Sequence, residues 1–349
     1  MRKILSVLLA AMLITGTSVT AFGATVSDVK KPMETAVQYI YGEKESFSAE
    51  DAKDFYLYLV SGADADRYAE KWCESVEQTV ENGTLSGIGN VALVLYDMLL
   101  LGKDPTDFGG TDLVALFAET PLNEYDNPYL DMYAADIACA FGLDMLGRQI
   151  CDRLVSKYTI GKGTDFWGGY GTSPDDLGVF IAAVSNYADD YREYMEDAVT
   201  LLKAYNTETG YDNYGVNANS TAYALAAAVC AQDKEMADDA FGKLMLFYNS
   251  KTGGFDSEYN DFISTQDAIF GLSHYFCYAE EDKPEPEKPG ITQPAEKPST
   301  QVSDKTENKV TNDKEEIKSP ATGVSLFVPF AAMLAAGGAM AVSGKRKKQ

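Results

Sequence analysis

An internal repeat of about 45 residues constrains the fold of this 349-residue chain more than any other feature. Five ten-residue segments align, and the spacings between their first residues are 45, 44, 45 and 44 positions. Those first residues are Ser86, Asp131, Asp175, Ser220 and Ser264. Each is of a type that caps helices, and each is followed by an almost wholly apolar run rich in small residues. A helix that is apolar on most faces is buried on most faces, so the repeat predicts five buried helices.

Amphipathic segments alternate with these apolar ones, and they cover residues 64–81, 145–158, 191–205 and 235–249. A sixth buried helix is predicted at 48–61, after a helix at 32–41, and no useful strand-type alternation occurs. Six buried helices would then alternate with six amphipathic ones. Hairpins of this length that close around a centre form an all-α (α/α)6 toroid, which we expect for residues 25–279. An open solenoid of helix pairs is the competing geometry.

The N-terminus has the three parts of a secretory signal peptide. Arg2 and Lys3 precede an apolar run at 4–14, and small residues follow it up to Ala24. The run is shorter than the ~20 residues that a membrane-spanning helix needs, so we expect residues 1–24 to be removed on export.

A second three-part signal covers residues 319–349. Ser319, Pro320, Ala321, Thr322 and Gly323 precede an apolar stretch at 324–344 and a basic tail. This arrangement resembles a sortase sorting signal of the SPxTG variety, with serine in place of the commoner leucine. The resemblance implies membrane retention, cleavage after Thr322 and transfer to peptidoglycan, on the surface of a Gram-positive bacterium. A plain C-terminal membrane anchor is the alternative.

Residues 280–318 are rich in Pro, Glu, Lys and Thr and nearly lack apolar side chains. Such a segment buries too little surface to offset its ordering entropy, so it is expected to form a disordered linker through the wall.

Charge excludes one class of partner. Six of the 29 basic residues lie in the two terminal signals, which contain none of the 53 acidic residues, so the remaining chain has a net charge of −30. A surface so acidic repels nucleic acid. Five cysteines occur without a CxxC pair, and we expect mostly buried free thiols.

Two motifs carry a family resemblance over residues 80–278. Residues 219–225 (Asn-Ser-Thr-Ala-Tyr-Ala-Leu) and 264–268 (Ser-Thr-Gln-Asp-Ala) are similar to the openings of inner helices in the terpenoid cyclase/protein prenyltransferase toroids. Glycine–aromatic turns containing Trp167, Tyr211 and Phe255 precede three openings by eight or nine residues. The resemblance implies the toroid fold but not a particular chemistry.

The chemistries of that superfamily fit poorly. Residues 173–176 (Ser-Pro-Asp-Asp) lack the first acid of the cyclase DxDD motif, and no glutamine lies three residues after a cysteine, as an internal thioester needs. His274 is the single histidine, so no zinc site is predicted. The related cobalamin carriers need a β-domain that the linker replaces here. A cobamide therefore remains only one candidate ligand, and no cofactor is predicted.

Carbohydrate processing is the main enzymatic alternative, because (α/α)6 barrels often house it. It requires paired carboxylates, which would lie near one mouth of the toroid. The candidates are Asp131, Asp175, Asp176 and Asp267, with Tyr129 and Tyr259 among the aromatic neighbours. Helix capping explains acids at such positions equally simply.

We therefore expect a non-catalytic binding or interaction module for a small molecule, glycan or peptide. Its site is predicted where the inner helices begin. The candidate residues are Trp167, Tyr170, Asp175, Asp176, Tyr214, Ser220, Thr221, Phe255, Ser264 and Gln266. An adhesin that binds through its outer face is a further alternative.

Overall fold

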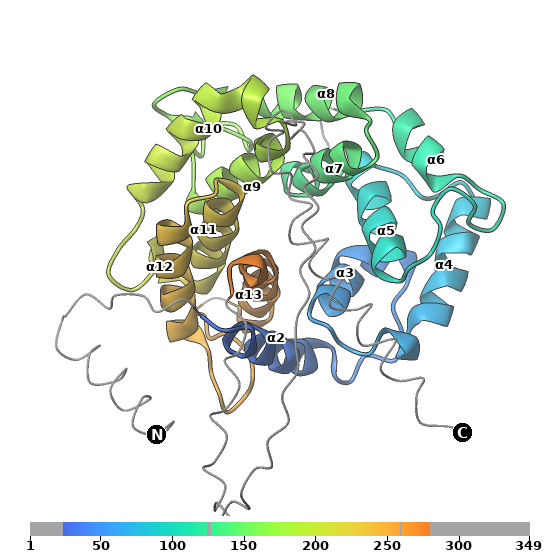
Figure 1. Cartoon of the computed structure of the whole chain (residues 1–349), viewed down its shortest axis with the longest axis horizontal. Helices are drawn as coiled ribbons and strands as arrows, with labels where there is room; N and C mark the ends of the chain where they lie inside the picture. Colours follow the sequence, from blue (N-terminus) through green and yellow to red (C-terminus); the bar gives the residue numbers. More distant parts are fainter. Residues whose placement is uncertain (1–23, 124–126, 259, 280–349) are drawn as a thin grey trace, which may run out of the picture. The chain divides into compact units, whose positions relative to one another are not determined.

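The computed structural model describes residues 24–123, 127–258 and 260–279 (Figure 1). The predicted signal peptide up to residue 23, the linker at 280–318, the sorting signal with Ser319–Gly323 and the aromatic Tyr259 lie outside the described residues. The expectation of an all-α domain is confirmed for the part described, which is predominantly helical.

Six helices, called the inner helices below, correspond to the five buried segments of the repeat and to the sixth predicted at 48–61. Their bounds are α3 (Ala52–Val60), α5 (Ile88–Leu100), α7 (Pro128–Ala140), α9 (Pro174–Val184), α11 (Ala218–Cys230) and α13 (Asp261–Tyr275). Most of their residues are buried, as their apolar sequences predict.

The amphipathic segments, the helix predicted at 32–41 and a short helix that the sequence did not indicate form the outer helices. Their bounds are α2 (Val26–Tyr41), α4 (Ala69–Glu81), α6 (Leu113–Glu119), α8 (Asp144–Val155), α10 (Ala188–Lys203) and α12 (Lys234–Leu244). Short 3₁₀ turns adjoin several helices: η1 (Ala49–Asp51), η2 (Ala65–Arg67), η3 (Ser185–Tyr187), η4 (Met245–Phe247) and η5 (Phe276–Tyr278). Trp72 of α4 is wholly buried, and its ring centroid lies 5.0 Å from that of Phe55 on α3.

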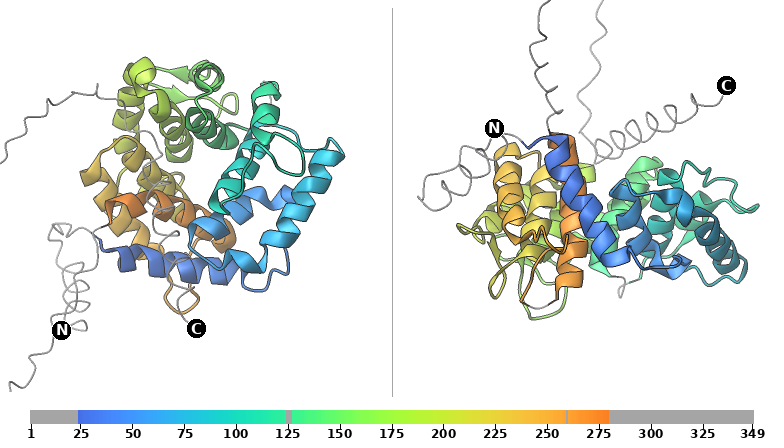
Figure 2. Two further views of the ribbon diagram at one scale, coloured as in Figure 1. Left: turned by 45° about the vertical axis from the view of Figure 1, so that its right-hand side comes forward. Right: turned by 90° about the horizontal axis from the view of Figure 1, so that it is seen from below.

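Each inner helix contacts the next inner helix along the chain, from α3 through α5, α7, α9 and α11 to α13. The last, α13, also contacts α2 and α3 at the start of the domain. Figure 2 shows α2 and α13 side by side in both views. The circuit of contacts therefore returns to its beginning, and α6, α8, α10 and α12 pack on α5, α7, α9 and α11.

Neighbouring inner helices approach closely where they carry glycine. A Cβ atom added to Gly178 of α9 would lie 2.8 Å from the carbonyl oxygen of Tyr223 on α11. One added to Gly271 of α13 would lie 2.7 Å from the carbonyl oxygen of Ala222, also on α11. The small residues of the repeat thus allow backbone to pack against backbone.

The predicted helix caps were wrong by two to four residues in four of the five repeats. The capping residues are Asn127, Ser173, Asn217 and Asn260, whose side chains accept backbone N–H groups at the starts of α7, α9, α11 and α13. Consequently Asp131, Asp175, Ser220 and Ser264 lie inside the helices. Helix α5 differs, because Gly87 precedes it and Ser86 lies outside.

Two hairpins of two-residue strands interrupt the helices. β1 (Tyr158–Thr159) pairs with β2 (Gly163–Thr164), and β3 (Tyr211–Asp212) pairs with β4 (Val216–Asn217), both antiparallel. Each hairpin lies in the connection leading to an inner helix. No helix among the described residues has the length and apolar character needed to cross a bilayer.

The five cysteines are free thiols. Cys151 and Cys230 are buried, whereas Cys73, Cys139 and Cys277 are half-buried. The expectation of mostly buried thiols therefore holds for two of the five.

Candidate functional site

The beginnings of the inner helices carry a set of linked polar side chains, which we call the mouth cluster. It comprises Lys53, Asp54, Tyr129, Asp175, Asp176, Asn219, Tyr223, Ser264, Gln266 and Asp267, with Tyr41 and Trp167 beside them. These residues come from α2, α3, α7, α9, α11, α13 and one connecting turn.

Asp176 holds two aromatic residues in place. It lies in the first turn of α9, where Ser173 caps its backbone N–H. Its Oδ1 accepts a hydrogen bond from the Tyr129 hydroxyl at 3.0 Å and another from Trp167 Nε1 at 3.2 Å. Burial raises the pKa of this carboxyl, and the donors oppose the rise.

Asp267 is the centre of a second group. It accepts from Asn219 Nδ2 at 2.8 Å and from the Tyr223 hydroxyl at 3.4 Å, and Lys53 Nζ lies 3.9 Å away. Ser264 supports Asn219 by donating to its Oδ1 at 2.6 Å. Burial raises the pKa of Asp267, against the opposing effects of Lys53, Asn219 and Tyr223.

Gln266 joins the last inner helix to the start of the domain. Its Nε2 donates to Asp54 Oδ1 at 2.6 Å and lies 2.9 Å from the Tyr41 hydroxyl. Tyr41 donates to the same oxygen of Asp54 at 3.0 Å. Lys44 lies 3.9 Å from the other oxygen of Asp54. A hydrogen-bonded chain therefore spans residues more than 200 positions apart in sequence.

Asp175 is the least satisfied carboxyl of the mouth cluster. Burial and the nearby charges of Asp267 and Asp176 raise its pKa to about 7, although the Ser220 hydroxyl opposes this. Its Oδ1 is buried and has no hydrogen-bond partner. A buried acceptor without a partner is costly, so the Asp175 carboxyl has a hydrogen-bonding capacity that the fold leaves unused.

No protein-family model matches the sequence, and no curated protein matches it.

Asp131 does not belong to the mouth cluster. It is almost wholly buried and pairs with Arg153 of the outer helix α8. This ion pair joins an inner helix to its outer partner, which is a structural role. The sequence pattern placed Asp131 with the other acids because it occupies the same position in the repeat.

Thr221 and Phe255 also have structural roles, because both are wholly buried. Thr221 accepts from the Tyr211 backbone N–H at 3.1 Å, and Thr265 accepts from that of Phe255 at 2.9 Å. In both repeats the motif threonine fixes the preceding glycine–aromatic turn onto its helix. Ser220 is wholly buried rather than at the surface.

Three predicted aromatic residues are exposed before α9 and α11. The exposed fractions are 51% for Trp167, 79% for Tyr170 and 91% for Tyr214. Tyr214 has a positive φ of 57°, which is uncommon for a bulky residue. These side chains are accessible to a ligand, in contrast to Phe255.

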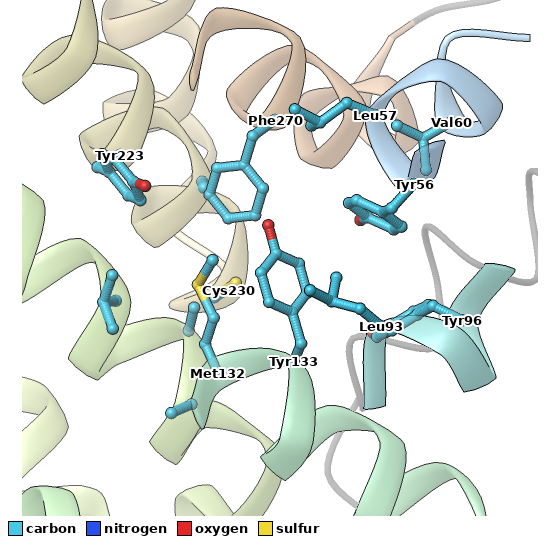
Figure 3. Packing of buried hydrophobic residues seen from close by; sticks show 14 of the residues in the cluster. Tyr56, Leu57, Val60, Leu93, Tyr96, Met132, Tyr133, Tyr223, Cys230 and Phe270 are labelled. Carbon is cyan, nitrogen blue, oxygen red and sulfur yellow. The ribbon is translucent and has the colours of Figure 1, made fainter. Parts of the chain in front are cut away.

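Buried aromatic residues of the inner helices pack together in the interior, and Figure 3 shows several of them around Tyr133. Tyr133 extends from α7 toward Phe270 of α13, with ring centroids 6.0 Å apart. The ring centroid of Tyr56 lies 5.3 Å from that of Tyr133, and the ring centroid of Tyr223 lies 5.5 Å from that of Phe270. The Tyr133 hydroxyl is buried without a hydrogen-bond partner.

His274 lies in this interior and has the features of a core residue. Its Nδ1 is 3.0 Å from the Phe270 carbonyl oxygen, and burial lowers its pKa to about 4. Within the described residues, no three His, Cys, Asp or Glu side chains are grouped as a metal site would require.

Sequence reasoning missed several members of the mouth cluster. Lys53, Asp54 and Tyr41 come from α2 and α3, where the repeat is weakest. Asn219 directly precedes the Ser-Thr pair of α11, so its place in the motif was the one available signal.

Proposed function

We propose that this chain is a surface protein of a Gram-positive bacterium, exported by its N-terminal signal and joined to peptidoglycan by a sortase. Its helical domain acts as a non-catalytic module that binds a small molecule, glycan or peptide. The proposal for the location rests on the two terminal signals in the sequence.

We further propose that the domain is an (α/α)6 toroid of the prenyltransferase-like kind. The support is the order of contacts, in which α13 meets α2 and α3 after the intervening inner helices have each met the next. The alternation of inner and outer helices agrees with the same architecture.

The binding role is carried by one observation, which is the partly unsatisfied mouth cluster beside exposed aromatic residues. Asp175 has a buried oxygen without a partner, and Trp167 is half exposed within hydrogen-bonding distance of Asp176. Convergent polar groups with aromatic surface are typical of ligand sites.

A carbohydrate-active enzyme is the second candidate, favoured by the raised pKa of about 7 for Asp175. Such an enzyme needs a second carboxylate to act on the sugar. Asp176 is engaged by Tyr129 and Trp167, and Asp267 by Asn219, Tyr223 and Lys53. Because both neighbours are held by other side chains, the geometry supports binding better than hydrolysis.

A ligand screen tests the binding role. The purified protein is heated with cobamides, neutral oligosaccharides or peptidoglycan fragments, and the unfolding temperature is recorded. A ligand at 100 times its Kd adds about 2.7 kcal/mol, which corresponds to roughly 5 °C for a domain of this size. Asp175→Asn should reduce that shift, whereas Asp189→Asn on the exposed side of α10 should not. Absence of a shift with every compound would contradict the proposal.

Replacement of Thr322 tests the location. Thr322→Ala removes the residue whose carbonyl carbon the sortase is proposed to attack, so the wall-linked fraction should fall to background. The protein should then accumulate with the membrane, as measured by muramidase release of labelled cells. Unchanged covalent attachment in the variant would exclude sorting at this bond.

A further inference from the structure

Trp167 is a half-exposed ring held in a fixed orientation. Its Nε1 donates to Asp176, and its ring centroid lies 6.1 Å from that of Tyr129. Three glycines with positive φ, Gly168, Gly169 and Gly171, shape the turn after it. A fixed aromatic face loses little conformational entropy when a ligand covers it, so it is preorganised for contact.

Two further exposed aromatic side chains lie in the turns before α9 and α11. Tyr170 belongs to the same turn, and Tyr214 lies in the hairpin before α11. Tyr205 joins the two regions, because its hydroxyl donates to the Thr172 carbonyl at 3.0 Å.

The polar groups of the mouth cluster are mixed donors and acceptors, and a lysine lies near two of its four carboxyls, Lys53 near Asp267 and Lys44 near Asp54. Asn219 and Tyr223 donate hydrogen bonds to Asp267, which also has Lys53 3.9 Å away. Tyr129 and Trp167 donate to Asp176. Asp175 carries the buried oxygen without a partner. A strongly cationic ligand would find most of these acceptors already occupied. A neutral ligand with several hydroxyl groups can use both the donors and the acceptors.

We infer that the mouth cluster binds a neutral sugar, whose apolar face lies on the Trp167 ring and one of whose hydroxyls donates to Asp175. This inference rests on the proposed binding role and names its ligand class. A sugar ring has C–H groups on one face and hydroxyls at its edge, which matches a flat aromatic surface beside polar side chains.

Fluorescence provides a direct test, because the chain has two tryptophans, and Trp72 is wholly buried whereas Trp167 is half exposed. Iodide should quench Trp167 selectively. Neutral tetrasaccharides of glucose, galactose, mannose or N-acetylglucosamine are titrated into the full chain, and at least one should protect it. Trp167→Ala should weaken binding of that sugar, measured by calorimetry, by about tenfold or more. Asp175→Asn should also weaken it, and Tyr39→Ala, an exposed aromatic on the outer helix α2, should leave it unchanged.

Each outcome decides for or against the inference. Protection by a sugar that both Trp167→Ala and Asp175→Asn reduce supports it. Binding that neither variant changes overturns the assigned site. If no sugar binds but choline, a cobamide or a wall peptide does so in a Trp167-dependent way, the sugar inference fails while the binding role stands. If no compound binds at all, both fail.

Discussion

At pH 8 the Asp136→Asn variant should be more stable to unfolding than the parent chain by up to about 4 kcal/mol. Asp136 lies on α7, its Oδ1 is buried without a partner, and burial raises its pKa to about 7. The unfolded chain should titrate this group near 3.9. The folded state therefore binds the proton more tightly. The contribution of this carboxyl to the free energy of unfolding is therefore fully present below about pH 4, and it is lost as the pH rises to about 7.

Asparagine has nearly the same shape and no charge to bury, so the advantage of the variant should disappear near pH 4. Urea unfolding of both proteins at pH 8, 6 and 4.5 measures the difference. Asp107→Asn, in an exposed loop, is the control and should change stability little at any of these values. Equal stability of Asp136→Asn and the parent at all three pH values would show that Asp136 keeps its charge at little cost.

The repeat allowed most of the fold to be predicted because its signal is physical. Buried helices must be apolar on most faces, and five of them recur at nearly constant spacing, so their number and order followed from the sequence. Helix α6 was not located, since its seven residues are too few to show an amphipathic pattern.

The exact starts of the inner helices were harder to predict for a different reason. Polar residues occur both at the caps and inside the first turns, as Asn217 and Ser220 do in α11. Sequence alone does not distinguish a capping side chain from one that points into a polar mouth. The predicted caps were therefore members of the site or the core.

The candidate site was predictable only where the repeat carried it. Asp175 and Asp176 lie in the first turn of α9 and Asp267 in the second turn of α13, so their gathering followed from the expected architecture. Lys53 and Asp54 reach the same place by closure between α3 and α13, which local patterns do not encode. Asp97 on α5 is a wholly buried carboxyl, and neither of its oxygens has a hydrogen-bond partner. Nothing in the apolar sequence around it predicted this.

Replacing a helical glycine with alanine should change the stability of the domain in opposite directions on an inner and an outer helix. Alanine is a better helix former than glycine by about 1 kcal/mol, so Gly→Ala in a helix is stabilising where space allows. At Gly271 the added Cβ would lie 2.7 Å and 3.0 Å from backbone atoms of Ala222, which cannot move aside as a flexible side chain can. At Gly242, in α12, no atom lies within 4 Å of the added Cβ.

The small-residue helices pack backbone against backbone in the interior, which brings their polar first turns together. Urea unfolding of Gly271→Ala and Gly242→Ala compares the same chemical change on an inner and an outer helix. The expected result is a loss of about 1–3 kcal/mol for Gly271→Ala and a gain of up to about 1 kcal/mol for Gly242→Ala. Stabilisation by both substitutions would mean that α13 does not pack closely on α11, and the proposed arrangement of the site would then be wrong.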